Sequence, residues 1–123
     1  MKKAKFKVDI YEQNVIVIVL ENVQKLDDYY RKLRKTLKYP NDEDEGLAQG
    51  LVLSKGFNTY LLLSEDKICV NLICHEATHV CYSILDMNNI SLDESEETVA
   101  LLNGFINEKI FKALQKLNYE IKF

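Results

Sequence analysis

Residues 72–81 have the sequence LICHEATHVC and carry the strongest structural signal in the chain. The stretch has no proline or glycine, and its apolar residues predict a helix that is buried along one side. His75 and His79 are four residues apart, about one helical turn, so both imidazoles leave the same face. Glu76 lies at the edge of that face. The stretch therefore predicts a helix with one apolar, buried face and an opposite face that carries two imidazoles and a carboxylate.

The histidine spacing is typical of a zinc site, because zinc accepts imidazole nitrogen and prefers four ligands. In such a site Glu76 takes a proton from water bound to the metal and does not ligate the metal itself. The chain has 2 histidines, and both are in this motif. We therefore predict one Zn²⁺ per chain, with His75 and His79 as ligands and Glu76 as the catalytic base. The alternative is a metal-free helical module with two ordinary histidines.

A catalytic zinc site needs a third protein ligand, and no histidine remains to supply it. Asp86 shares the histidine face, but it lies about 10 Å beyond His79 along the helix axis. Cys74 and Cys81 are about 100° from the nearest histidine in helical projection, which disfavours both. The third ligand is therefore expected outside this helix.

The acidic run at residues 93–97 opens the next predicted helix, across a turn from the histidines. Glu97 leads a helical face that includes Ala100 and Gly104, whose small size would let two helices approach closely. The positive end of the helix dipole also favours an anion at this position. We predict Glu97 as the third ligand, with Glu94 and Glu96 as the alternatives.

The N-terminal half has the patterns of strands and one helix. Alternation at residues 6–10 predicts a strand, and the β-branched run at 15–20 predicts a second strand covered on both faces. These two strands fit a hairpin. Two more strands are expected at 47–54 and 57–64, joined around Lys55-Gly56.

Three helices are expected, at residues 24–38, 65–87 and 94–117. The last of them has an apolar side formed by Val99, Leu102, Phe105/Ile106, Ile110, Leu114 and Leu117. We see no repeat and no linker, so we predict one α+β domain over 1–123. Its sheet should be small and mostly antiparallel, with about four strands packed on the histidine helix, the glutamate-bearing helix and one further helix.

Composition supports neither a nucleic-acid partner nor a membrane-spanning segment. The net charge is −3, from 16 basic and 19 acidic residues, so no cationic field argues for nucleic acid. The longest apolar run, residues 15–20, is too short to span a membrane, and charges near the N-terminus break any export signal. The 3 cysteines are an odd number with spacings that fit neither a disulfide framework nor a CxxC knuckle. A reducing cytoplasm is the expected compartment.

The motif at 75–79, followed by a glutamate on the next helix, resembles the zincins with a glutamate third ligand, the gluzincins. More narrowly, residues 72–106 are similar to small zincin-like proteins of phages and prophages, which tend to have an E-x-x-A-x-L-x-G-x-I helix. Glu97 occupies the ligand position of that pattern. The match covers about a third of the chain. It implies a minimal zincin-like fold and location in a host cytoplasm or virion if the protein is phage-encoded.

The resemblance has departures. The third histidine of the metzincins is absent, and Leu101 stands where thermolysin-like enzymes have an aspartate. The oxyanion-stabilising residue is unassigned, with Tyr82, Tyr60 and Asn103 as candidates. Residues 45–49 faintly resemble the glycine-rich segment of peptide deformylases, but the cysteine motif of that family is missing.

The expected function is zinc-dependent hydrolysis of peptide bonds in a peptide or protein substrate. The substrate backbone would add to an exposed strand edge, at 47–54 or 57–64. The alternative is a zinc-stabilised, non-catalytic phage structural or host-interaction protein. The short chain and the unassigned oxyanion donor favour that alternative.

Overall fold

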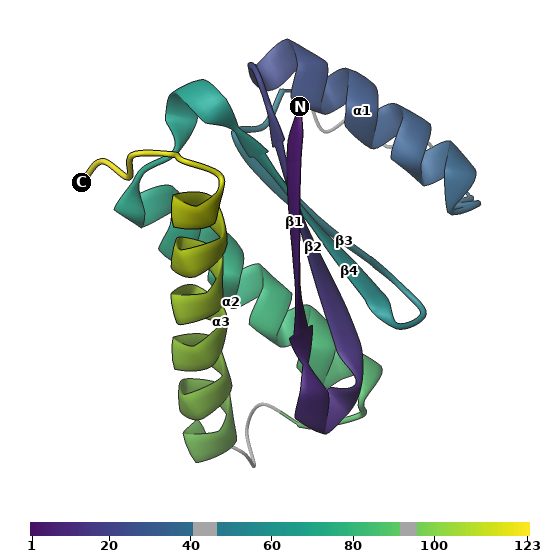
Figure 1. The fold of residues 1–123 in the computed structure, drawn as a ribbon. Coiled ribbons are helices and arrows are strands. Elements are labelled where there is room, and N and C mark those ends of the chain that lie inside the picture. Colours follow the sequence, from purple (N-terminus) through teal and green to yellow (C-terminus); the bar gives the residue numbers. More distant parts are fainter. Residues whose placement is uncertain (41–46, 92–95) are drawn as a thin grey trace.

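The computed structural model describes residues 1–40, 47–91 and 96–123. They form one four-stranded sheet with helices on both faces (Figure 1). The described strands and helices are β1 (Lys2–Val8), β2 (Gln13–Leu20), α1 (Val23–Thr36), β3 (Gly50–Lys55), β4 (Asn58–Ser64), α2 (Val70–Met87) and α3 (Glu96–Lys116). The predicted α+β class, with a sheet of about four strands and three helices, is confirmed for the described residues.

The strand order in the sheet is β1-β2-β4-β3, so β1 and β3 are the outer strands. The predicted hairpin is confirmed, because β1 and β2 pair antiparallel with Phe6 opposite Val15. β3 and β4 also pair antiparallel, but the central pair, β2 and β4, is parallel. The sheet is therefore mixed, because the chain passes through α1 and β3 before β4 returns beside β2.

Both faces of β2 are buried, as its β-branched sequence predicts. Val15, Val17 and Val19 pack in the larger core with α2 and α3. Ile18 and Leu20 pack in a smaller core with α1 on the opposite face. The sheet thus has α2 and α3 on one side and α1 on the other. Burying each of these side chains stabilises the fold by about 1.5–3 kcal/mol.

Several predicted element boundaries differ from the structure, and two of these differences put a 3-10 turn in place of a predicted strand or helix end. Ile10 is not in the first strand but in a short 3-10 turn, η1 (Asp9–Tyr11), where it is 81 % exposed. Glu12 closes this turn in the left-handed region, with φ 51°. The motif helix does not begin at Glu65: residues Glu65–Lys67 form a second 3-10 turn, η2, and α2 begins at Val70.

The start of α2 is fixed by its cap and by the C-terminal tail. The Cys69 thiol accepts a hydrogen bond from the Leu72 amide, at 3.5 Å between Sγ and N. The Val70 amide donates to the Lys122 carbonyl at 2.7 Å. The first amides of a helix have no partner within the helix, so these two contacts determine where α2 begins.

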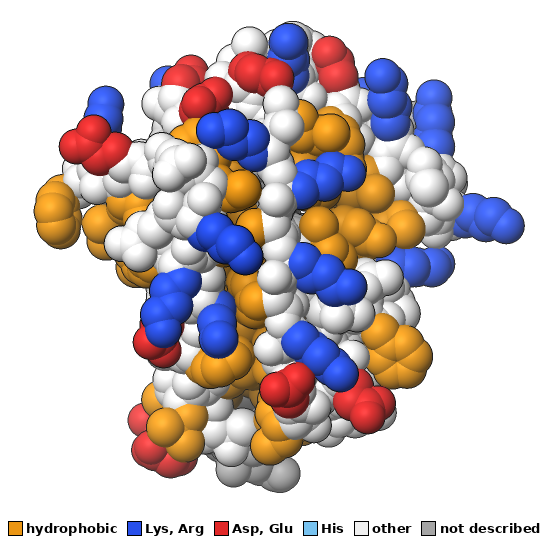
Figure 2. Space-filling model, viewed as in Figure 1, with side chains coloured by type: hydrophobic (Ala, Val, Ile, Leu, Met, Phe, Trp, Pro, Cys, Tyr) orange, Lys and Arg blue, Asp and Glu red, His pale blue; other side chains and the backbone are white. Residues whose placement is uncertain are grey.

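The outer strand β1 has four lysines in seven residues, KKAKFKV. Figure 2 shows basic side chains along both sides of this strand, with hydrophobic side chains between them. At the other edge of the sheet, β3 packs against α2. The two free edges of the sheet therefore have different surroundings.

Candidate metal centre

α2 presents its two histidines to solvent and buries its back. Ile73, Ala77 and Val80 are fully buried against the sheet and α3, whereas His75 and His79 are exposed. The apolar positions anchor the helix rigidly, so the imidazoles are held on a fixed backbone. The predicted division of this helix into an apolar back and a polar front is confirmed.

The two imidazoles converge on one point in space. The Nε2 atoms of His75 and His79 are 3.2 Å apart, and the ring centroids are 4.9 Å apart with an interplanar angle of 71°. Two nitrogens bound to one tetrahedral zinc at 2.0–2.1 Å would be about 3.3 Å apart. The observed separation therefore fits two ligand positions of a zinc ion. It also fits a single N–H···N hydrogen bond between neutral imidazoles.

Glu76 lies beside this pair, beneath the edge of β3. Its side chain is buried, with the residue 5 % exposed, and Oε1 is 3.9 Å from His75 Nε2. Burial raises the pKa of the Glu76 carboxyl above its ordinary value, and the positive charge of a protonated His79 or His75 opposes that rise. A buried carboxyl beside two histidines is placed to accept a proton and to return it.

Gly50, the first residue of β3, is in close contact with this carboxyl. A Cβ atom on Gly50 would lie 2.9 Å from Glu76 Cγ, 3.0 Å from Cδ and 3.1 Å from Oε1. Only a glycine leaves that space without displacing Glu76. The sequence prediction missed this residue, although a glycine in a strand is a known sign of close backbone approach.

Two hollows flank Glu76 along the edge of β3. One has a volume of about 360 Å³, and the other about 300 Å³. Gly50, His75 and Glu76 line both of them. Gln49, Asn71, Leu72 and Cys69 complete the first, while Leu51, Val52, His79 and Ser83 complete the second. Two hollows thus lie between the outer strand and the motif helix, both lined by the buried carboxyl.

The structure does not bring Glu97 to the histidines. Glu97, Ala100 and Gly104 are exposed, and a Cβ on Gly104 would meet no atom within 4 Å. The face chosen to approach α2 therefore points to solvent, and the packing argument for Glu97 is wrong. α3 packs through the opposite stripe, which includes Leu102 and Ile106. The ligand role of Glu97 stays a prediction that this geometry does not support.

No other third ligand joins the pair within residues 1–40, 47–91 and 96–123, where no three His, Cys, Asp or Glu side chains are grouped to hold a metal. Glu96 is exposed in the first turn of α3. Glu94, the other predicted alternative, lies outside the described residues. Asp86 is exposed and lines a separate hollow with Tyr82 and Ser83.

The three cysteines differ in their surroundings. All three are free thiols, as expected. Cys69 caps α2, and Cys74 is exposed. Cys81 is fully buried, and burial raises the pKa of its thiol to about 11. At neutral pH Cys81 is therefore protonated and a poor metal ligand.

Of the three candidates for stabilising the oxyanion, Tyr60 is wrong, and the roles of Tyr82 and Asn103 stay unassigned. Tyr60 packs in the core on the α1 side of the sheet, opposite to the face that α2 covers. Tyr82 is exposed on α2, one turn beyond His79. The Asn103 carbonyl accepts a hydrogen bond from the Asn107 amide within α3.

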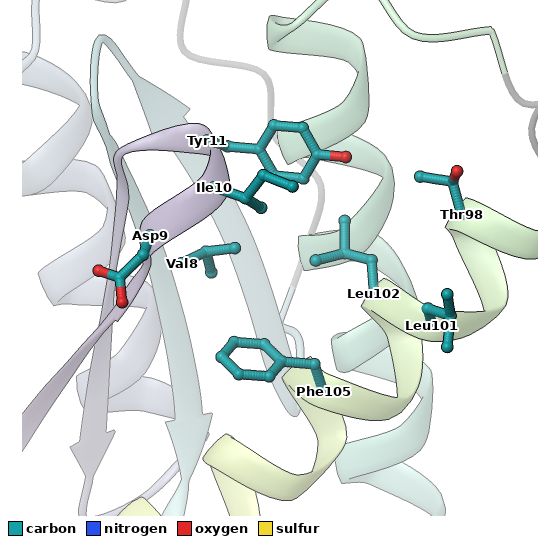
Figure 3. A pocket seen from close by; sticks show the side chains of 8 residues that line it. All are labelled: Val8, Asp9, Ile10, Tyr11, Thr98, Leu101, Leu102 and Phe105. Carbon is teal, nitrogen blue, oxygen red and sulfur yellow. The ribbon is translucent and has the colours of Figure 1, made fainter.

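Another hollow lies between η1 and the start of α3 (Figure 3). Its volume is about 490 Å³, and its lining is mostly apolar. Ile10, Leu101 and Phe105 reach into it from the two sides. It shares no lining residue with the two hollows beside Glu76 and contains no histidine or cysteine. It is therefore separate from the candidate metal centre.

Within the described residues, none of the helices has the length and apolar character needed to cross a membrane. Comparison with protein-family models, with curated proteins and with solved structures found no match to this chain.

Proposed function

We propose that this chain is a zinc-dependent hydrolase, a metallopeptidase that cleaves peptide bonds in a peptide or protein. The observation that carries the proposal is the 3.2 Å separation of the His75 and His79 Nε2 atoms beside the buried Glu76 carboxyl. The three side chains provide two zinc ligands and a proton acceptor in one place. The resemblance to small phage zincins supports the same activity and extends the proposal to a zincin-like fold and a phage or prophage origin.

Each side chain has a distinct role in the proposed reaction. His75 and His79 would hold the ion, which would supply an activated water and polarise the substrate carbonyl. Glu76 accepts a proton from the attacking water and delivers it to the leaving nitrogen. The contact with Gly50 fixes the position of the Glu76 carboxyl.

The outer edge of β3 is the proposed substrate-binding edge. β3 pairs only with β4 among the described strands, so its other edge is open beside the two hollows. An extended peptide added to this edge would cross the Glu76 carboxyl. β4 is excluded from this role, because it is hydrogen-bonded to β2 on one side and to β3 on the other.

The second candidate is a zinc-stabilised protein without turnover, a phage structural or host-interaction factor. It is favoured by the short chain and by the lack of an assigned oxyanion donor, since Tyr60 packs on the other face of the sheet. Both candidates require zinc, and only the first requires Glu76 as a base. The three free thiols support a reducing compartment for either candidate function.

Metal analysis of the purified protein tests the shared requirement. We expect about one zinc per chain, because the histidine pair matches the spacing of two zinc ligands. The variant His79→Ala should lose zinc affinity by more than about a hundredfold, which exceeds the loss typical of outer-shell changes. Asp86→Ala, on the same face of α2, is the matched control and should bind zinc normally. Absence of zinc from the wild type, also after zinc is added back, would rule out both candidates.

The third ligand is decided by a pair of glutamate variants. The sequence predicts that Glu97→Ala loses zinc affinity by at least about tenfold, whereas the outward face of Glu97 in the structure predicts no loss. Glu96→Ala, one residue earlier and equally exposed, controls for the change in charge. A loss confined to Glu97→Ala would assign the ligand and show that the start of α3 is repositioned in the zinc-bound protein. Equal affinities would remove Glu97 from the site.

A further inference from the structure

The outer strand β1 lies at the opposite edge of the sheet from the proposed metal centre. Its lysines Lys2, Lys3, Lys5 and Lys7 are all exposed. On the edge that faces away from β2, the backbone amides and carbonyls of β1 have no strand partner among the described residues. This edge therefore combines unpaired backbone hydrogen-bonding groups with a row of positive charges.

α3 runs beside β1 and adds a second row of lysines. Lys109, Lys112 and Lys116 line a groove between the helix and the strand, together with Lys3 and Lys5. The groove has a volume of about 360 Å³, and its floor is apolar, with contributions from Phe6, Ala113 and Leu117. Figure 2 shows this face, with basic side chains on both sides of the strand and hydrophobic surface between them.

The positive charge of this face is largely uncompensated by the described residues. On this face Lys112 forms an ion pair with Glu108, at 3.0 Å between exposed side chains. Lys5, Lys7 and Lys116 make no ion pair with a described carboxylate. The whole chain has a net charge of −3, so this basic face is a local concentration of charge.

Lysines on an outer strand by themselves prevent two copies of a protein from pairing edge to edge. That explanation covers the lysines of β1 but not the parallel row on α3, which lies off the strand edge. Two basic rows around an apolar floor repel basic strands and attract acidic ones. We propose that the β1 edge and its groove bind an extended acidic peptide segment, which adds to the sheet as an antiparallel or parallel strand.

The bound segment would alternate acidic and apolar side chains. Successive side chains of a strand point to opposite faces, so the acidic set would face the lysines of β1 on the α1 side, where Lys3 lies over the Tyr29 ring. The apolar set would cover Phe6 and Leu117 on the other side, beside the lysines of α3. The open strand edge favours a peptide over a nucleic acid, because a phosphate backbone cannot continue the ladder of backbone hydrogen bonds. This proposal is independent of zinc and of the hydrolase activity.

Fluorescence anisotropy with a labelled peptide of about ten alternating glutamate and valine residues tests this proposal, since this length spans β1. We expect saturable binding to the wild-type chain, and protection of β1 backbone amides from hydrogen exchange when the peptide is added. The double variant Lys5→Glu/Lys116→Glu should weaken the affinity by at least about tenfold, because two attractive contacts become repulsive. Lysine in place of glutamate in the peptide should abolish binding.

The matched control is Lys32→Glu/Lys35→Glu on α1, which changes the net charge equally on the other side of the sheet. We expect this variant to bind the acidic peptide nearly as the wild type does. Equal weakening in both double variants would overturn the proposal, as would binding without protection of β1. A thymidine oligonucleotide of similar length that binds more tightly than the peptide, with the same lysine dependence, would replace the peptide with a single-stranded nucleic acid.

Discussion

Replacing Glu76 with glutamine should lower the rate of peptide hydrolysis by about 10²–10⁴-fold, the usual contribution of a general base. Glutamine has nearly the same size and fits under β3 in the same way, but its amide cannot accept the proton. The two histidines are untouched, so zinc content should stay at the wild-type level. The rate can be measured by mass spectrometry on a proteome-derived peptide library, and zinc by elemental analysis of the same samples.

Glu108→Gln is the matched control, because Glu108 is exposed on α3 and pairs with a lysine rather than with a histidine. It should keep wild-type turnover. Unchanged turnover in Glu76→Gln would remove Glu76 as the base. Zinc binding without cleavage by either the variant or the wild type would favour the non-catalytic candidate.

Local patterns predicted the elements well, because each depends on the residues within it. The β-branched run at 15–20 gave a strand buried on both faces, and both cores meet at β2. The parallel pairing of β2 with β4 was not predictable in this way. Which strands become neighbours depends on how α1 and β3 pack after β2. The hydrophobic periodicity within a strand carries no information about that pairing.

Element ends were less predictable, because short-range contacts decide them. The charged residues at 65–67 are compatible with a helix, yet the extended backbone at Ile68 and the cap at Cys69 start α2 later. A cysteine cap is unusual among capping residues. The partner of the Val70 amide comes from Lys122 in the C-terminal tail, which is distant in the sequence.

The outward position of Glu97 follows from the same periodicity that predicts the buried side of α3. The apolar stripe of α3 was predicted correctly, and Ile106 is fully buried within it. Glu97 precedes Ile106 by nine residues, which is about 2.5 helical turns, so the two lie on opposite faces. The exposed Leu101, at 68 %, belongs to the same outward face as Glu97. The periodicity that fixed the core therefore also argued against Glu97 as a contact to α2.

Gly50 was missed because its role depends on a residue that is 26 positions away in the sequence. Nothing near residue 50 indicates that the α2 carboxyl will lie against it. A glycine at a strand start is ambiguous between a turn and a close approach, and only the folded structure distinguishes them.

Gly50→Ala should lower turnover by about tenfold to a hundredfold while zinc content stays unchanged. The added methyl group would lie 2.9–3.1 Å from the side-chain atoms of Glu76, so the carboxyl must move away from its position. A misplacement of about 1 Å in a reacting group can cost a hundredfold in rate. Because the end of the Glu76 side chain is flexible, the displaced carboxyl should cost little stability, and the variant should stay folded.

Gly104→Ala is the control for the general effect of replacing glycine by alanine. It lies in an exposed part of α3 where a Cβ meets nothing within 4 Å, so it should raise the free energy of unfolding by about 0.5–1 kcal/mol and leave turnover unchanged. Comparing thermal unfolding, zinc content and turnover of both variants separates backbone effects from the contact with Glu76. Wild-type turnover in Gly50→Ala would mean that the carboxyl needs no fixed position under β3. A loss confined to Gly50→Ala would instead link the outer strand directly to the base, since zinc ligation by the histidines is the same in both variants.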